Sequence, residues 1–176
     1  MASGTRSLLI VFIVLAAVSF FLPGWAVYLL TVILARGLVV LGLLVLWRAG
    51  LMSFGQALYF GLGAYTVGLM QLHSGLRDAF ALVALGTIVA ALVAAILGFL
   101  LRQYRDIFFA MLSLAFSMIL YGTLVKSETL GSTDGFSVAL PHFLFWAPAA
   151  GQAQYALLFL CLAVAGLGSY IVQRYL

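Results

Sequence analysis

The sequence predicts an all-α integral membrane protein, a bundle of about six transmembrane helices. Of its 176 residues, 66% are hydrophobic and only 7% are charged, whereas a soluble domain carries roughly a quarter charged residues. The mean hydropathy is +1.28, and the apolar residues fall in runs about long enough to cross a bilayer. These observations exclude a water-soluble fold.

Six apolar runs define the expected spans, because a helix needs about 20 apolar residues to cross the hydrocarbon. They cover residues 7–23, 25–46, 51–71, 79–101, 107–125 and 151–173. The first run is short and ends at Pro23; it is interpreted as an uncleaved span, with a cleaved signal peptide as the alternative. Since no second domain is visible, residues 1–176 are expected to form a single transmembrane domain.

The basic residues predict the orientation, because cytoplasmic flanks of spans carry an excess of arginine and lysine. With the N-terminus inside, the cytoplasmic set is Arg6, Arg48, Arg102, Arg105 and Arg174, and the outer set is Arg77 and Lys126. Both termini are therefore expected in the cytoplasm, with the polar stretch 126–150 outside.

Motifs for catalysis and metal binding are missing from the sequence. There is no G-x-x-x-x-G-K-[ST] loop, so ATP hydrolysis by that route is not expected. His73, His142 and Cys161 stand alone without metal-ligand spacing. We expect no catalytic residue, cofactor or metal, and we attribute the net charge of +4 to membrane topology rather than to a nucleic-acid partner.

Polar residues and glycines interrupt the apolar pattern at residues 48–56, where Ser53 and Gln56 stand near Gly50 and Gly55. The pattern predicts a broken helix, which is a common way to build a substrate path in transporters. A simple cytoplasmic turn before an ordinary span is the alternative.

A second polar feature lies in the fifth run, where serine and tyrosine recur every four residues on one helix face. Such a stripe is expected to avoid lipid, although serine can also bond to its own helix. The candidate translocation path comprises Ser53, Gly55, Gln56, Ser113, Ser117 and Tyr121.

Arg36 lies near the middle of the second run. An intramembrane arginine is costly and is a functional candidate by default. The run contains no acidic residue, so snorkelling and a contact with a partner subunit remain alternatives.

Small residues form two stripes that are expected to let helices pack closely. They are Ala57, Gly61, Ala64 and Gly68 in the third run, and Ala84, Ala91, Ala95 and Gly98 in the fourth.

Three blocks resemble one family. Residues 49–66 read AGLMSFGQALYFGLGAYT and resemble the G-x-x-S-x-G-H/Q-x-x-x-x-G-x-G-A-Y signature of branched-chain amino acid ABC transporter permeases, in particular the LivM-like subunit. Residues 105–116, RDIFFAMLSLAF, resemble the second block of that family, and residues 131–136, GSTDGF, resemble its outward G-G-S/T-D-G loop. The resemblance covers about residues 36–141.

The resemblance implies a permease subunit of an ABC importer for branched-chain or hydrophobic amino acids, or for related small solutes such as urea and amides. It implies a multi-pass protein of the bacterial inner (plasma) membrane. The implied partners are a second permease subunit, two ABC ATPase subunits and an extracytoplasmic solute-binding protein. The candidate contact for the binding protein is the loop segment Gly131, Ser132, Thr133, Asp134 and Gly135.

The sequence departs from the family in two ways. Gln56 stands where many relatives carry histidine. The chain also stops before the cytoplasmic coupling segment of the family, so it is expected to be truncated at its C-terminal end, the N-terminal part of a longer family domain. A stand-alone channel or secondary transporter is the alternative function, and a membrane scaffold without transport activity is a third.

Overall fold

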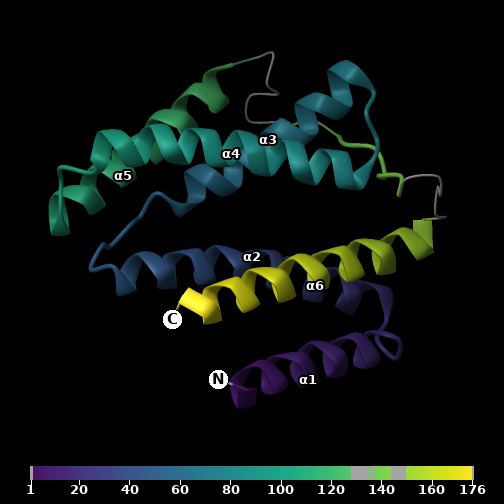
Figure 1. The fold of residues 1–176 in the computed structure, drawn as a ribbon. Helices are drawn as coiled ribbons and strands as arrows, with labels where there is room; N and C mark the ends of the chain where they lie inside the picture. The colour runs from purple at the N-terminus through teal and green to yellow at the C-terminus, as the bar shows by residue number, and fades with distance from the viewer. Residues whose placement is uncertain (1, 128–134, 136, 144–149, 176) are drawn as a thin grey trace. The chain divides into compact units, whose positions relative to one another are not determined.

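The computed structural model describes residues 2–127, 135, 137–143 and 150–175. In this part of the chain the prediction of six helices is confirmed (Figure 1). The helices are α1 (Ala2–Ser19), α2 (Gly24–Arg48), α3 (Gln56–Ser74), α4 (Ala79–Leu101), α5 (Asp106–Lys126) and α6 (Ala150–Tyr175). They form two compact units, Met1–Val45 with Pro148–Leu176, and Leu46–Ala147.

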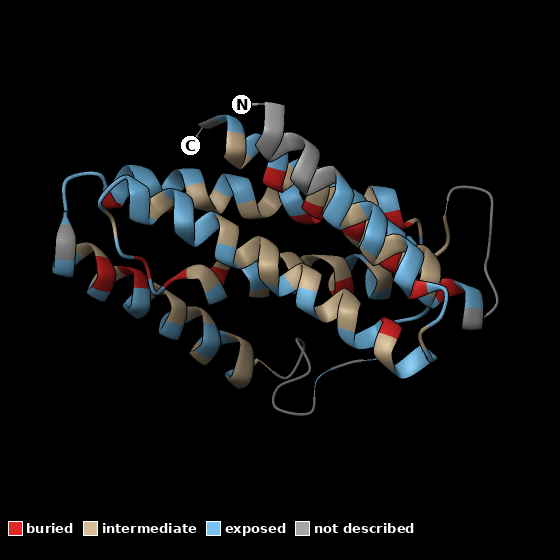
Figure 2. Ribbon diagram, turned by 90° about the horizontal axis from the view of Figure 1, so that it is seen from below, coloured by how far each residue is buried: buried red, intermediate tan, exposed pale blue. Residues whose placement is uncertain are grey.

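Four helices are long and apolar enough to cross a membrane. Within the described residues these spans are Gly24–Arg48, Ala79–Leu101, Ile107–Lys126 and Gln152–Arg174. Many positions along the helices are exposed (Figure 2). Large apolar residues are among the exposed ones, as at Phe21 in the turn after α1, which is 91% exposed, and at Ile107 of α5, which is 69% exposed. Because an apolar surface of this extent is not stable in water, the protein is a multi-pass membrane protein.

The first unit packs α1, α2 and α6 around a small apolar core. Val27 and Leu158 are fully buried, and Leu162 completes the cluster. The Leu38 side chain of α2 packs against Gly168 of α6, where a Cβ atom would lie 2.8 Å from Leu38 Cδ2. Apolar contacts therefore hold the helices of this unit together.

In the second unit, α3 packs against both α4 and α5. Its buried core consists of Leu58, Leu97 and Leu101. Helices α3 and α4 approach each other closely at Gly86, where a Cβ atom would lie 3.3 Å from the Gly63 carbonyl oxygen. Glycine at this position lets the two backbones come together.

The small-residue stripes predicted from the sequence match this packing only in part. Gly68 on α3 is buried, whereas the four predicted stripe residues of α4 are exposed. They are Ala84, Ala91, Ala95 and Gly98. The prediction selected the wrong face of α4, because spacing alone does not show which of several small residues meets the neighbouring helix.

Residues 137–143, which follow α5 in the sequence, pair with the turn between α3 and α4 through backbone hydrogen bonds. Gly75 ends α3 with φ 65° and donates its N–H to the Gln71 carbonyl, an αL cap that glycine adopts without strain. The His142 N–H donates to the Arg77 carbonyl at 2.6 Å, and the Ala79 N–H donates to the His142 carbonyl at 2.8 Å. This pairing ties residues 137–143 to the start of α4.

Candidate functional site

A non-helical segment, residues 49–55, separates α2 from α3, at the position where the sequence predicts either a broken helix or a turn before an ordinary span. The Gly50 N–H donates to the Trp47 carbonyl and the Leu51 N–H donates to the Leu46 carbonyl, both at 3.0 Å. With Gly50 at φ 77°, this is a Schellman motif, which ends a helix by satisfying its last carbonyl groups. The third helix therefore begins at Gln56, five residues later than the apolar run suggests.

Ser113 of α5 fixes this interruption in place. The Phe54 N–H donates to Ser113 Oγ at 3.1 Å, and Ser113 Oγ donates in turn to the Ala110 carbonyl at 2.8 Å. The Gly55 N–H donates to Ser53 Oγ at 3.2 Å. Ser53 and Ser113 are each only 6% exposed, so both buried hydroxyl groups have hydrogen-bond partners, as buried polar groups usually do.

Gly55 allows the same close approach. A Cβ atom there would lie 3.0 Å from the Ser113 carbonyl oxygen and 3.1 Å from Ser113 Cβ. Three predicted path residues, Ser53, Gly55 and Ser113, therefore form one contact that joins the non-helical segment to α5. We call this contact the Ser113 clasp.

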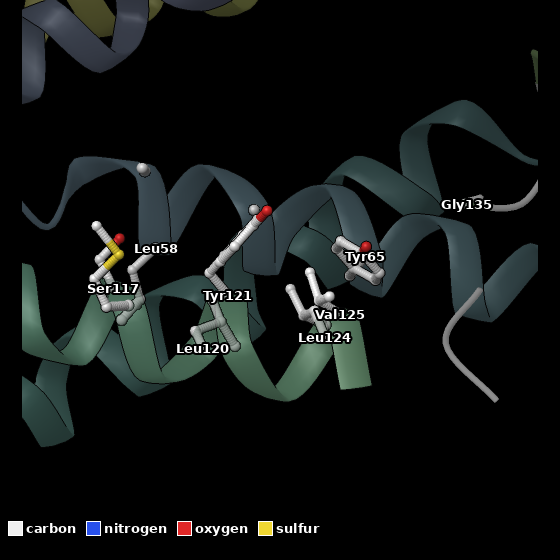
Figure 3. A pocket seen from close by; sticks show the side chains of 11 residues that line it. Leu58, Tyr65, Ser117, Leu120, Tyr121, Leu124, Val125 and Gly135 are labelled. Atoms are coloured by element: carbon white, nitrogen blue, oxygen red, sulfur yellow. The ribbon is translucent and has the colours of Figure 1, made fainter. Parts of the chain in front are cut away.

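A groove of about 800 Å³ runs between α3 and α5 (Figure 3). Residues from both helices form its wall. The lining residues are Ala57, Leu58, Gly61, Tyr65, Ser117, Met118, Leu120, Tyr121, Leu124, Val125 and Gly135. This is within the range of volumes, roughly 300–1,000 Å³, that hold small molecules in proteins.

The groove wall is apolar with a few hydroxyl groups. The described lining residues include no charged side chain, and Tyr65, Ser117 and Tyr121 supply the hydroxyl groups. On the α3 wall, one turn before Tyr65, a Cβ atom at Gly61 would meet nothing within 4 Å. Such a wall offers hydrogen bonds and apolar contact to a small solute without a fixed charge.

The remaining predicted site residues lie elsewhere. Gln56 begins α3 outside the groove lining, and Arg36 is exposed at the middle of α2 in the other unit. The loop segment Gly131, Ser132, Thr133 and Asp134 lies outside the described residues. Gly135, the described member of that loop segment, has φ 69° and lines the groove.

The α3 side of the groove was not predicted from the sequence as part of a site. Ala57 and Gly61 were assigned to helix packing, and Tyr65 was not singled out. Ala57, Gly61 and Tyr65 recur every four residues, as Ser117, Tyr121 and Val125 do on α5. Residues four apart lie on one helix face, so pairing these two repeats would have indicated the groove.

Comparison with known proteins gives one family. A family model described as the permease component of the branched-chain amino acid transport system matches residues 25–174. Comparisons with curated proteins and with solved structures gave no match. The family match includes α2 to α5 and nearly all of α6, and it therefore includes both the Ser113 clasp and the groove.

Proposed function

The chain belongs to the family of branched-chain amino acid transport permease components, and from this premise we propose that it is a LivM-like permease subunit of an ABC importer. Residues 1–176 act as one transmembrane permease domain. Nucleotide hydrolysis belongs to two partner ATPase subunits, since the sequence has no phosphate-binding loop of its own.

The proposed topology has six spans, with both termini in the cytoplasm. The proposed location is the bacterial inner membrane. The positions of the basic residues support it. Arg48 and Arg174 lie in the last turns of α2 and α6, and Arg102 directly follows α4. In this topology these three helices all end on the cytoplasmic side, where basic residues are favoured.

The groove between α3 and α5 is proposed to be this chain's part of the solute path. It is the observation on which the proposal depends, because the groove combines room for a small solute with an uncharged, hydroxyl-bearing wall. Tyr121 is 65% exposed in this chain. A second permease subunit would cover that open side and complete the path.

The proposed solutes are branched-chain or other hydrophobic amino acids, or related small molecules such as urea and amides. Apolar side chains of a solute would contact Leu124 and Val125, and its polar groups would reach the hydroxyl groups of Ser117 and Tyr121. A solute-binding protein would deliver the solute at the outer surface, where Gly131, Ser132, Thr133, Asp134 and Gly135 remain the proposed contact. Arg36 remains a proposed intramembrane contact with another subunit.

Uptake by the assembled transporter tests this function. The chain, a second permease, two ATPases and the binding protein are reconstituted in liposomes, and radiolabelled leucine uptake is measured with and without ATP. ATP-dependent uptake that disappears when this chain is omitted is the expected result. Uptake by this chain alone, driven by an ion gradient and indifferent to ATP, would instead establish a stand-alone channel or secondary transporter.

A further inference from the structure

The turn between α4 and α5, residues 102–105, carries two arginines between two membrane-spanning helices. Arg102, Tyr104 and Arg105 are all exposed. The flanking spans are Ala79–Leu101 and Ile107–Lys126. A four-residue turn between two spans lies at a membrane surface, whichever side of the membrane that surface faces. Both guanidinium groups are therefore at the depth of the lipid headgroups.

Exposed apolar side chains mark the edge of the hydrocarbon next to these arginines. Phe99 is 63% exposed and Phe108 is 70% exposed. The Arg102 guanidinium carbon lies 4.1 Å from the centre of the Phe99 ring, so the cation rests on an aromatic face. In this arrangement the apolar groups contact acyl chains while the charge stays at phosphate level.

The two positive charges have no described counter-charge nearby. Among the side chains that the structure describes, neither Arg102 nor Arg105 forms an ion pair. Asp78, a described acidic residue, precedes α4 at its opposite end. Asp106 directly follows Arg105 in the sequence, and its side chain lies outside the described residues. Since two arginines and one aspartate leave a net positive charge, an anion from outside this chain would neutralise the remainder.

We propose that Arg102 and Arg105 bind the phosphate group of an anionic phospholipid. Guanidinium groups form charge-assisted, often bidentate hydrogen bonds to phosphate oxygens. Basic residues next to a span are attracted to anionic lipid surfaces. The Phe99 ring holds the Arg102 side chain at the membrane surface, where a headgroup can reach it. The site is independent of the solute path and of the proposed transport activity.

Lipid binding to the purified chain tests the site. The protein in detergent is titrated with phosphatidylglycerol or phosphatidylcholine, and bound lipid is counted by native mass spectrometry. The wild-type chain is expected to prefer phosphatidylglycerol. Replacing both arginines, R102Q/R105Q, is expected to lower that preference roughly 30-fold, about fivefold for each charge lost at the surface. R102K/R105K keeps both charges and is expected to retain most of it.

A matched control removes two charges from the opposite ends of the same helices. R77Q/K126Q is expected to keep the preference, because these two residues lie on separate segments. The single variants R102Q and R105Q extend the test if the double variant does not fold. Equal losses in the control and the double variant, or no preference in the wild type, would overturn the proposal. An unchanged preference in R102Q/R105Q, with loss of ATPase subunits from the assembled transporter, would assign the turn to a protein contact instead.

Discussion

Replacing Gly61 with phenylalanine is expected to reduce solute uptake by the assembled transporter about tenfold or more while the chain stays folded. A Cβ atom at Gly61 meets nothing within 4 Å, so the backbone accepts a side chain there. The open space that the ring would enter is the groove, which Gly61 lines together with Tyr121 of α5. The ring therefore obstructs the proposed path instead of disturbing the core. The measurement is the initial rate of ATP-dependent uptake in liposomes.

Gly98 provides the control for this substitution. It is also a helical glycine whose Cβ position is empty within 4 Å, but it lies on an exposed face of α4, away from the groove. Gly98→Phe adds the same side chain and is expected to leave uptake within about twofold of wild type, because exposed substitutions have small effects. Equal uptake by both variants would show that solute does not pass through the groove.

The second large effect is expected on stability, at Gly55. Adding one methyl group, Gly55→Ala, places a Cβ atom 3.0 Å from the Ser113 carbonyl oxygen. Because this oxygen belongs to the backbone of α5, it cannot move away without disturbing that helix. Overpacking of this kind costs about 1–3 kcal/mol. A loss of about 2 kcal/mol lowers Tm by roughly 4–8 °C in a chain of this length. Thermal unfolding of the purified protein in detergent measures the change.

Two comparisons isolate the Ser113 clasp as the cause. Gly61→Ala adds the same methyl group into open space and is expected to raise stability by up to about 1 kcal/mol through helix propensity. Ser113→Ala removes the acceptor of the part-buried Phe54 N–H, and a loss of about 0.5–1.5 kcal/mol is expected. The clasp would be refuted if Gly55→Ala and Ser113→Ala both unfolded at the wild-type Tm.

The helices could be predicted from the sequence because in lipid each span must satisfy its own backbone. In the described part of the chain, four of the six apolar runs coincide with helices that are long and apolar enough to span the membrane. The Ser113 clasp was predicted only as a polar interruption. That Ser53 and Ser113, sixty residues apart, meet through the backbone at Phe54 depends on tertiary contact, which local pattern does not contain.

Only the α5 side of the groove was predicted from the sequence. Ser117 and Tyr121 stood out because polar residues are rare in an apolar run, whereas Ala57 and Gly61 looked like ordinary packing residues. Small residues serve both to bring helices together and to leave space between them. Gly86 and Gly61 show the two cases, since one has a neighbouring backbone 3.3 Å from its Cβ position and the other has none within 4 Å.

Water access to Ser117 tests most directly whether the groove carries solute. In a chain whose native Cys161 is replaced by serine, Ser117→Cys is treated with a charged, membrane-impermeant thiol reagent. Ile119→Cys serves as the control, because Ile119 is exposed on the face of α5 turned away from Ser117 and does not line the groove. Cys at position 117 is expected to be labelled in the assembled transporter, transported solute is expected to slow its labelling, and position 119 is expected to stay unlabelled. Labelling at 117 only by a membrane-soluble reagent, unaffected by solute, would contradict this prediction.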